Sequence, residues 1–365
     1  MQKKNIYDPN FLSNLEMSHD LAEYDLDEVE RQFVQLLSLE NLDKKIRDNP
    51  SLTEALEIAI EEAVADAYEN DGEADHCHLF LQRILYRINR MKLFWYDSLS
   101  NYDNECSPYL AGIRNRIEFA WQEWEREQLG LNSLKEENIE NGLRKRADAD
   151  LEPEATETDC YFRNEMTQKG YRCLLAISSL DGLVEASQLS RMIGGVSNEV
   201  QSMLTRLLIE EYGAGRLPRK HSSYFAEMLM ELGMETEPEA YFDLVPWQVL
   251  ANINHSFFLC DRNRHFLRYI GGLLYTEISV PYAFNNYKVC ADRLSLSEKA
   301  QGYWDLHIKV DKMHGQWMLN DVAIPLIDDY KKFAWEMLLG YDQQKFISAR
   351  AGKAVAREAL EADQE

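Results

Sequence analysis

The sequence has no long apolar run of the kind that crosses a membrane. Its most apolar segment, FLRYIGGLLYTEISVPYAF, is interrupted by Arg268 and Glu277, whereas a spanning helix needs about 20 consecutive apolar residues. The N-terminal stretch MQKKNIYDPNF also lacks the apolar run of a signal peptide. We therefore predict a protein that has no membrane-spanning segment and resides in the cytoplasm.

Cysteines at metal-binding or redox spacing are also missing. The six cysteines lie far apart, and none forms the CxxC spacing that is typical of zinc sites and dithiol redox centres. The segment Gly213-Ala214-Gly215 follows no predicted strand and precedes no Lys-Ser or Lys-Thr pair, so we do not interpret it as a phosphate-binding loop. No dinucleotide or flavin motif occurs either, so a redox enzyme with this sequence would need an external electron donor.

Positive charge is scarce. The chain has 39 Lys and Arg against 63 Asp and Glu, which gives a formal net charge of -24. Contact with nucleic-acid phosphates requires a concentration of basic side chains, so this composition argues against a nucleic-acid-binding protein. The simplest role of the negative charge is solubility, and attraction of a cationic substrate is the alternative.

Apolar residues recur at helical spacing through nearly the whole chain, and alternating Val, Ile and Thr runs are few. We predict an all-α protein. The charged segment 133–158 is poor in apolar residues and contains Pro153, which is typical of a linker or loop. We therefore predict a helical N-terminal region over residues 1–150, ending in this linker, and a second domain over residues 151–365. Its predicted helices cover about 163–180, 183–193, 198–211, 221–232, 245–253, 261–280, 297–319 and 324–339, followed by a weakly amphipathic tail.

The stretch DLHIKVDKMHGQW carries three polar residues with the spacing of metal ligands. His307, Asp311 and His314 stand at i, i+4 and i+7, so in a helix all three side chains leave the same face within two turns. Two imidazoles and a carboxylate suit a divalent first-row metal, and the thiolates of a structural zinc site are absent. The pattern predicts a site for iron or manganese.

Three ligands leave a metal ion under-coordinated, and four further residues are candidates to complete the site. Glu277 lies in an otherwise apolar stretch, where an unpaired carboxylate is costly to bury. Glu211 ends one predicted helix and His221 opens the next, and the break between them contains Gly213, Gly215 and Pro218, so the two side chains can approach one ion. Glu185 shares an apolar helix side with Leu189 and Met192.

Each of these residues alone is more often a hydrogen-bonded core residue than a ligand. Together they supply four carboxylates and three imidazoles from one half of the chain, the donors that a di-iron carboxylate site requires. A ferritin-like site, which needs two Glu-x-x-His motifs and further glutamates, is a weaker alternative suggested by Glu73-x-x-His76. A haem-binding protein is disfavoured, because a haem pocket requires one axial ligand in an apolar slot and not four carboxylates. A helical binding protein without catalytic activity is the alternative from another class.

The region from about 162 to 340, which holds these residues, resembles the haem-oxygenase-like di-iron oxidases, also called iron-containing redox enzymes. In that family a helical bundle of the haem-oxygenase type holds two iron ions instead of haem. A branch that oxygenates nitrogen has seven ligands whose types and spacing find counterparts here: Glu185, Glu211, His221, Glu277, His307, Asp311 and His314. Other branches use six, and the extra carboxylate, matched by Glu211, is associated with N-oxygenation.

The resemblance implies a haem-oxygenase-like helical bundle, preceded by an N-terminal helical region that forms a homodimer. It implies two Fe(II) ions, O2 as co-substrate, an external reductase or other electron donor, and a small amine, amino-acid-derived or other, as the substrate of N-oxygenation. The same scaffold could instead carry out desaturation, decarboxylation or C–C cleavage. Measurement of bound metal distinguishes an N-oxygenase or a carbon-oxidising enzyme from the non-catalytic binding protein.

Two hypotheses about the arrangement of the site follow from the sequence. The first places Glu211, His221 and His314 around one ion and the remaining residues, Glu277, His307 and Asp311, around the other, with Glu185 bridging or shared. The second concerns a substrate carboxylate, which an arginine would bind through paired hydrogen bonds. The candidates for that arginine are Arg216, Arg262, Arg264 and Arg268.

Overall fold

The chain is described here by a computed structural model. The structure describes residues 25–365 except for 70–73, 94–97, 137, 185 and 195–198. Within these residues the backbone forms helices, turns and irregular segments, and no strand occurs. The predicted all-α fold is confirmed. No helix in the described part of the chain combines the length and the apolar character needed to cross a membrane.

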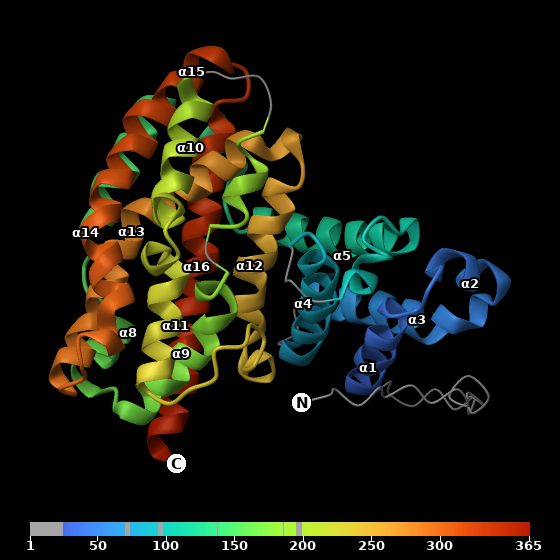
Figure 1. Cartoon of the computed structure of the whole chain (residues 1–365). Coiled ribbons are helices and arrows are strands. Elements are labelled where there is room, and N and C mark those ends of the chain that lie inside the picture. The colour runs from blue at the N-terminus through green and yellow to red at the C-terminus, as the bar shows by residue number, and fades with distance from the viewer. Residues whose placement is uncertain (1–24, 70–73, 94–97, 137, 185, 195–198) are drawn as a thin grey trace.

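The N-terminal helices form a bundle with a hydrophobic core of its own (Figure 1). Phe33, Ile60, Leu81 and Trp121 are fully buried in this core. Trp247 from the C-terminal region packs into the same core, which joins the two regions. The helices of this bundle are α1 (Leu26–Leu37), α2 (Leu42–Asp48), α3 (Glu54–Val64), α4 (Asp75–Arg90) and α5 (Pro108–Glu127).

A larger bundle of mostly long helices follows (Figure 1). Its helices are α6 (Leu131–Glu136), α7 (Ile139–Leu151), α8 (Glu157–Cys160), α9 (Gln168–Gly182), α10 (Glu199–Glu211), α11 (His221–Glu231), α12 (Trp247–Cys260), α13 (Phe266–Arg293), α14 (Gly302–Trp317), α15 (Ile324–Asp329) and α16 (Trp335–Gln364). The central pair is α13 and α16. A Cβ atom on Gly271 would lie 2.0 Å from the Met337 carbonyl oxygen, so the two backbones touch where the helices cross.

Several segments differ from the prediction. The helix predicted over 324–339 is divided by a turn at 330–334, and α13 continues to Arg293, beyond the predicted end at 280. The charged segment expected to be a linker contains α7, because Leu143 and Ala147, four residues apart, are buried in the main core and hold the helix against it. Residues 183–193 do not form the predicted helix: outside residue 185 they form turns and a short 3-10 helix, Leu189–Arg191, and Ala186 has a left-handed φ of 51°. The predicted weak tail is the continuation of α16.

Candidate metal centre

The three predicted ligands at i, i+4 and i+7 lie on α14. The structure confirms that His307, Asp311 and His314 share one helix, and all three side chains are buried. The neighbouring Gly315 allows α14 to approach α13 closely, because a Cβ atom there would lie 2.8 Å from Ile278 Cδ1. This close approach places Glu277 of α13 beside His314.

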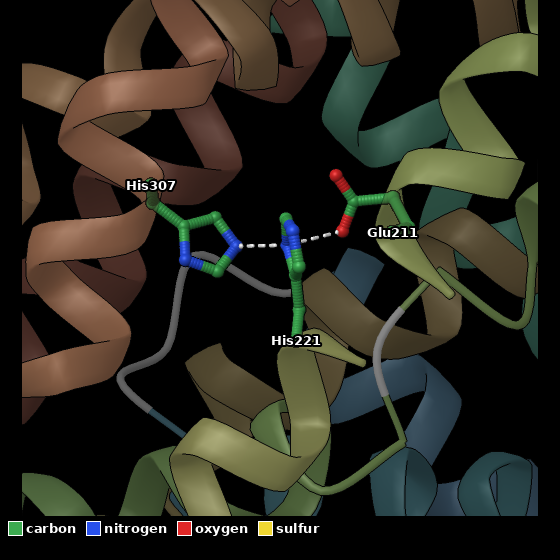
Figure 2. Close-up of side chains that lie close together, drawn as sticks. All are labelled: Glu211, His221 and His307. Carbon is green, nitrogen blue, oxygen red and sulfur yellow. Dashed lines mark hydrogen bonds and ion pairs between the residues drawn. The ribbon is translucent and has the colours of Figure 1, made fainter. Parts of the chain in front are cut away.

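The break between α10 and α11 brings Glu211 and His221 together, as the sequence predicted. His221 Nδ1 lies 2.7 Å from Glu211 Oε2 (Figure 2). The chain reverses between them through Gly213 and Ala214, whose φ angles are 61° and 53°. Gly213 also faces the backbone, since a Cβ atom would lie 2.4 Å from the Arg219 carbonyl carbon. Glycine is therefore required here for both conformation and space.

His221 also faces His307 of α14. Its Nδ1 lies 3.1 Å from His307 Nε2, and the two rings meet edge to face (Figure 2). His307 Nδ1 donates a hydrogen bond to the Tyr303 carbonyl oxygen at 2.9 Å. This bond holds the proton of the neutral ring on Nδ1 and leaves the Nε2 lone pair directed toward His221 and Glu211, which is the orientation a metal ligand needs.

His314 Nδ1 lies among three carboxylates. It is 3.3 Å from Glu277 Oε2, 3.5 Å from Glu211 Oε1 and 3.6 Å from Asp311 Oδ1. Among the described residues, neither His314 Nδ1 nor Asp311 Oδ1 has a hydrogen-bond partner, although both atoms are buried. Buried polar atoms without partners are costly, and a cation between these donors would satisfy them.

Glu211 belongs to two groups of donors. One ligand atom each from Glu211, His221 and His307 lies within 4.8 Å of the others, and the same holds for Glu211, Asp311 and His314. The hypothesis from the sequence grouped His221 with His314 and His307 with Asp311, whereas the structure pairs His221 with His307. The remaining predicted residue, Glu185, lies outside the described residues.

The electrostatics of the centre also favour a cation. Burial raises the pKa of Asp311 well above its ordinary value and raises that of Glu277, and neighbouring carboxylates add to both shifts. Burial alone would lower the pKa of His314, but Glu277, Glu211 and Asp311 outweigh it and raise it to about 9. None of these carboxylates pairs with a Lys or Arg of the described residues. Divalent cations would neutralise them, and the donor set of imidazoles and carboxylates suits iron.

Glu210 is a candidate functional residue that the sequence did not reveal. Its Oε2 lies 3.1 Å from His314 Nε2, on the side of the ring opposite the three carboxylates. A carboxylate in this position holds the ring proton on Nε2 and keeps Nδ1 available for a metal. Glu210 itself lies within reach of Arg206, whose Nε is 3.6 Å from Glu210 Oε1. The chain offers no local signal for this role, because Glu210 and His314 meet only through the packing of α10 on α14.

A cavity of about 210 Å³ opens onto the centre. Four candidate ligands line it: Glu211, Glu277, His307 and Asp311. The volume is below the ~300–1,000 Å³ of sites for drug-sized ligands, so the cavity fits a small molecule.

No Lys or Arg of the described residues lines this cavity. The four arginines proposed to bind a substrate carboxylate lie elsewhere. Arg262 pairs with Glu118, Arg264 forms two 2.8 Å contacts with Glu336, and Arg268 is buried against Gln122. Arg216 is exposed on the segment between α10 and α11. The hypothesis of an arginine clamp in this cavity is therefore wrong for the described part of the chain.

Three other buried ring side chains of the described chain have structural roles. His78 stacks on Trp247 at the junction of the two regions, with ring centroids 4.2 Å apart. Trp304 is buried in the main core, and its Nε1 donates to the Tyr171 hydroxyl at 2.8 Å. His255 is fully buried beside Gln122.

Comparison with known proteins points to the same part of the chain. Residues 174–342 match the sequence model of a family described as iron-containing redox enzymes. The chain is also similar to the nitrosourea synthase of Streptomyces achromogenes subsp. streptozoticus, with 29% identity over 172 residues. The aligned region is 44% of this chain and 34% of that enzyme, so the match spans about a third of the length of the relative. All six described candidate ligands lie within residues 174–342.

Proposed function

We propose that this chain, whose residues 174–342 form a domain of the iron-containing redox enzyme family, is an O2-dependent di-iron oxygenase that transfers oxygen to the nitrogen of a small amine. The observation that carries the proposal is the position of Glu211 between two groups of ligands, one with His221 and His307 and one with Asp311 and His314. A carboxylate shared in this way can bridge two metal ions. Similarity to an enzyme named nitrosourea synthase supports nitrogen chemistry.

The candidate ligands would bind two iron ions in two groups. His221 and His307 would hold one iron ion and Asp311 and His314 the other, with Glu211 shared and Glu277 beside His314. The bound iron supplies the activation of O2. The buried side chains fix the positions of the ligands, and the cavity holds the amine against them and limits access of water.

The stoichiometry requires an external reductant. One oxygen atom of O2 enters an N–O bond, which converts an N–H group to N–OH, and the other oxygen leaves as water. Two electrons and two protons complete the balance. The described residues hold six free cysteines without a disulfide, and we propose an external reductase or chemical reductant as the source of electrons.

The decisive experiment measures iron and product together. Protein loaded with Fe(II) without O2 should retain about two ions per chain, and Mössbauer spectra should show two coupled ions. Addition of O2, reductant and a candidate amine should give a product heavier by one oxygen on nitrogen, labelled when ¹⁸O2 is used. An alkene or loss of CO2 would instead assign the scaffold to carbon chemistry, and retention of no iron would leave a binding protein.

Glu210→Gln should weaken iron binding without abolishing it. An amide is a poorer acceptor for the His314 Nε2 proton, so the ring loses orientation and basicity, and loss of such a partner costs about 10–100-fold in metal affinity. Competition with a chelator measures the affinity. Glu227→Gln, which changes a partly exposed carboxylate on α11 that pairs with Lys299, is the control. An unchanged affinity in Glu210→Gln would show that the contact has no positioning role.

The homodimer implied by the resemblance remains a proposal, with the N-terminal bundle α1 to α5 as its interface. Light scattering of the whole chain should give about twice the chain mass of 42.6 kDa.

A further inference from the structure

The cavity at the metal centre has an uneven chemical lining. Its candidate ligands are buried, whereas Asp181, at the end of α9, is exposed. Asp181 is the one charged lining residue of the described chain apart from those ligands. The acid therefore marks the solvent side of the cavity, and the candidate ligands form its floor.

Two neutral polar side chains of the lining, Gln344 and Thr276, leave acceptors available. Gln344 Nε2 donates to Asn252 Oδ1 at 2.6 Å and to Ser348 Oγ at 3.0 Å, which leaves the Gln344 carbonyl oxygen as an acceptor. Thr276 Oγ1 donates to the Gly272 carbonyl oxygen at 3.2 Å, so its lone pairs can accept. Asn252 keeps an amide donor, but a neutral amide cannot neutralise an anion.

The carboxylate of Asp181 and the acceptors of Gln344 and Thr276 suit a ligand that donates hydrogen bonds and is positively charged. An ammonium or guanidinium group donates to several acceptors and pairs with a carboxylate. A substrate carboxylate would meet Asp181 at the solvent side and find no cation among the described lining residues, which costs affinity through unpaired burial and like-charge repulsion. The net charge of -24 further raises the local concentration of cations.

We propose that the cavity selects a substrate with a cationic nitrogen group held at Asp181, remote from the nitrogen at the metal floor, and without a carboxylate at that end. This inference rests on the proposed function, which places the nitrogen to be oxygenated at the metal ligands and the other end of the substrate at Asp181. It narrows the substrate class from amines in general, amino acids included, to diamines and related dications. A carboxylate anchor, expected for an amino acid, has no place in it.

A pair of ligands of equal length tests the inference. Putrescine and 4-aminobutyrate both carry an ammonium on a four-carbon chain, and they differ in having a second ammonium or a carboxylate at the other end. Calorimetric titration of the Fe(II)-loaded protein without O2 should show putrescine binding at least about fivefold more tightly, as expected for a partly solvated ion pair opposed to a like-charge contact. The difference should shrink at high salt.

The Asp181→Asn variant should reduce the preference for putrescine to below about twofold, since the acid is then neutral and both ligands meet the same lining. Asp305→Asn, which removes a partly exposed acid paired with Lys309 outside the cavity, should leave the preference unchanged. Equal or tighter binding of 4-aminobutyrate, an unchanged preference in Asp181→Asn, or no measurable putrescine binding would each overturn the inference. Because no O2 is present, these results are independent of whether the enzyme oxygenates nitrogen.

Discussion

Replacement of Glu211 by alanine is expected to remove iron from both positions of the centre and to lower O2-dependent turnover by at least about a thousandfold, equivalent to ~4 kcal/mol. The reason is geometric. Glu211 is the carboxylate that both groups of donors share, one with His221 and one with Asp311 and His314. Loss of any other single member of the two groups leaves one group complete, whereas loss of Glu211 leaves neither complete.

Iron per chain and turnover are measured on the same preparation. Glu199→Ala, an exposed acid in the first turn of the same helix, serves as the control and should retain iron and activity. Circular dichroism should show the same helical content in both variants. If Glu211→Ala keeps one tightly bound ion, and thus half of the iron content per chain, the carboxylate belongs to one ion only. The bridging role is then contradicted.

Replacement of Gly340 by alanine is expected to lower the free energy of unfolding by about 1–3 kcal/mol, the usual range for overpacking. The added methyl would lie 2.0 Å from the Arg268 carbonyl oxygen on α13, and backbone cannot move away as a side chain could. Because α13 carries Glu277, the displacement should also weaken iron binding. Denaturant titration measures the change in stability.

Gly352→Ala on the same helix is a matched control, because no atom lies within 4 Å of the added methyl. It should stabilise the protein by about 1 kcal/mol through helix propensity. Equal stabilities for the two variants would mean that α13 and α16 do not cross in direct backbone contact.

The success of the fold prediction followed from local periodicity. Helical spacing identified α10, α11 and α14 nearly at their observed bounds, because one face of each helix is buried and the other is exposed. The end of α16 was read as a weak tail because several of its sides are covered, as buried Ala351, Ala354 and Ala359 show. Helix α7 was missed because two buried residues, Leu143 and Ala147, hold a mostly charged segment.

The candidate site divides in the same way. His307, Asp311 and His314 could be found from sequence because four- and three-residue steps on one helix fix their common face. Glu211 and His221 could be placed together because Gly213 and the following break reverse the chain locally. Glu210 could not be found, since an acid beside an acid at a helix end has no distinctive pattern.

The sequence by itself determined that the protein is helical and which residue types could hold metal ions, since both depend on steps of three or four residues along a helix. Only the tertiary structure decided that His221 faces His307, that Glu211 is shared between two groups and that Glu210 orients His314. It also decided that the lining of the cavity within the described chain contains Asp181 besides the candidate ligands, and no arginine. These features depend on which helices pack together, and that packing joins residues about a hundred positions apart in the chain.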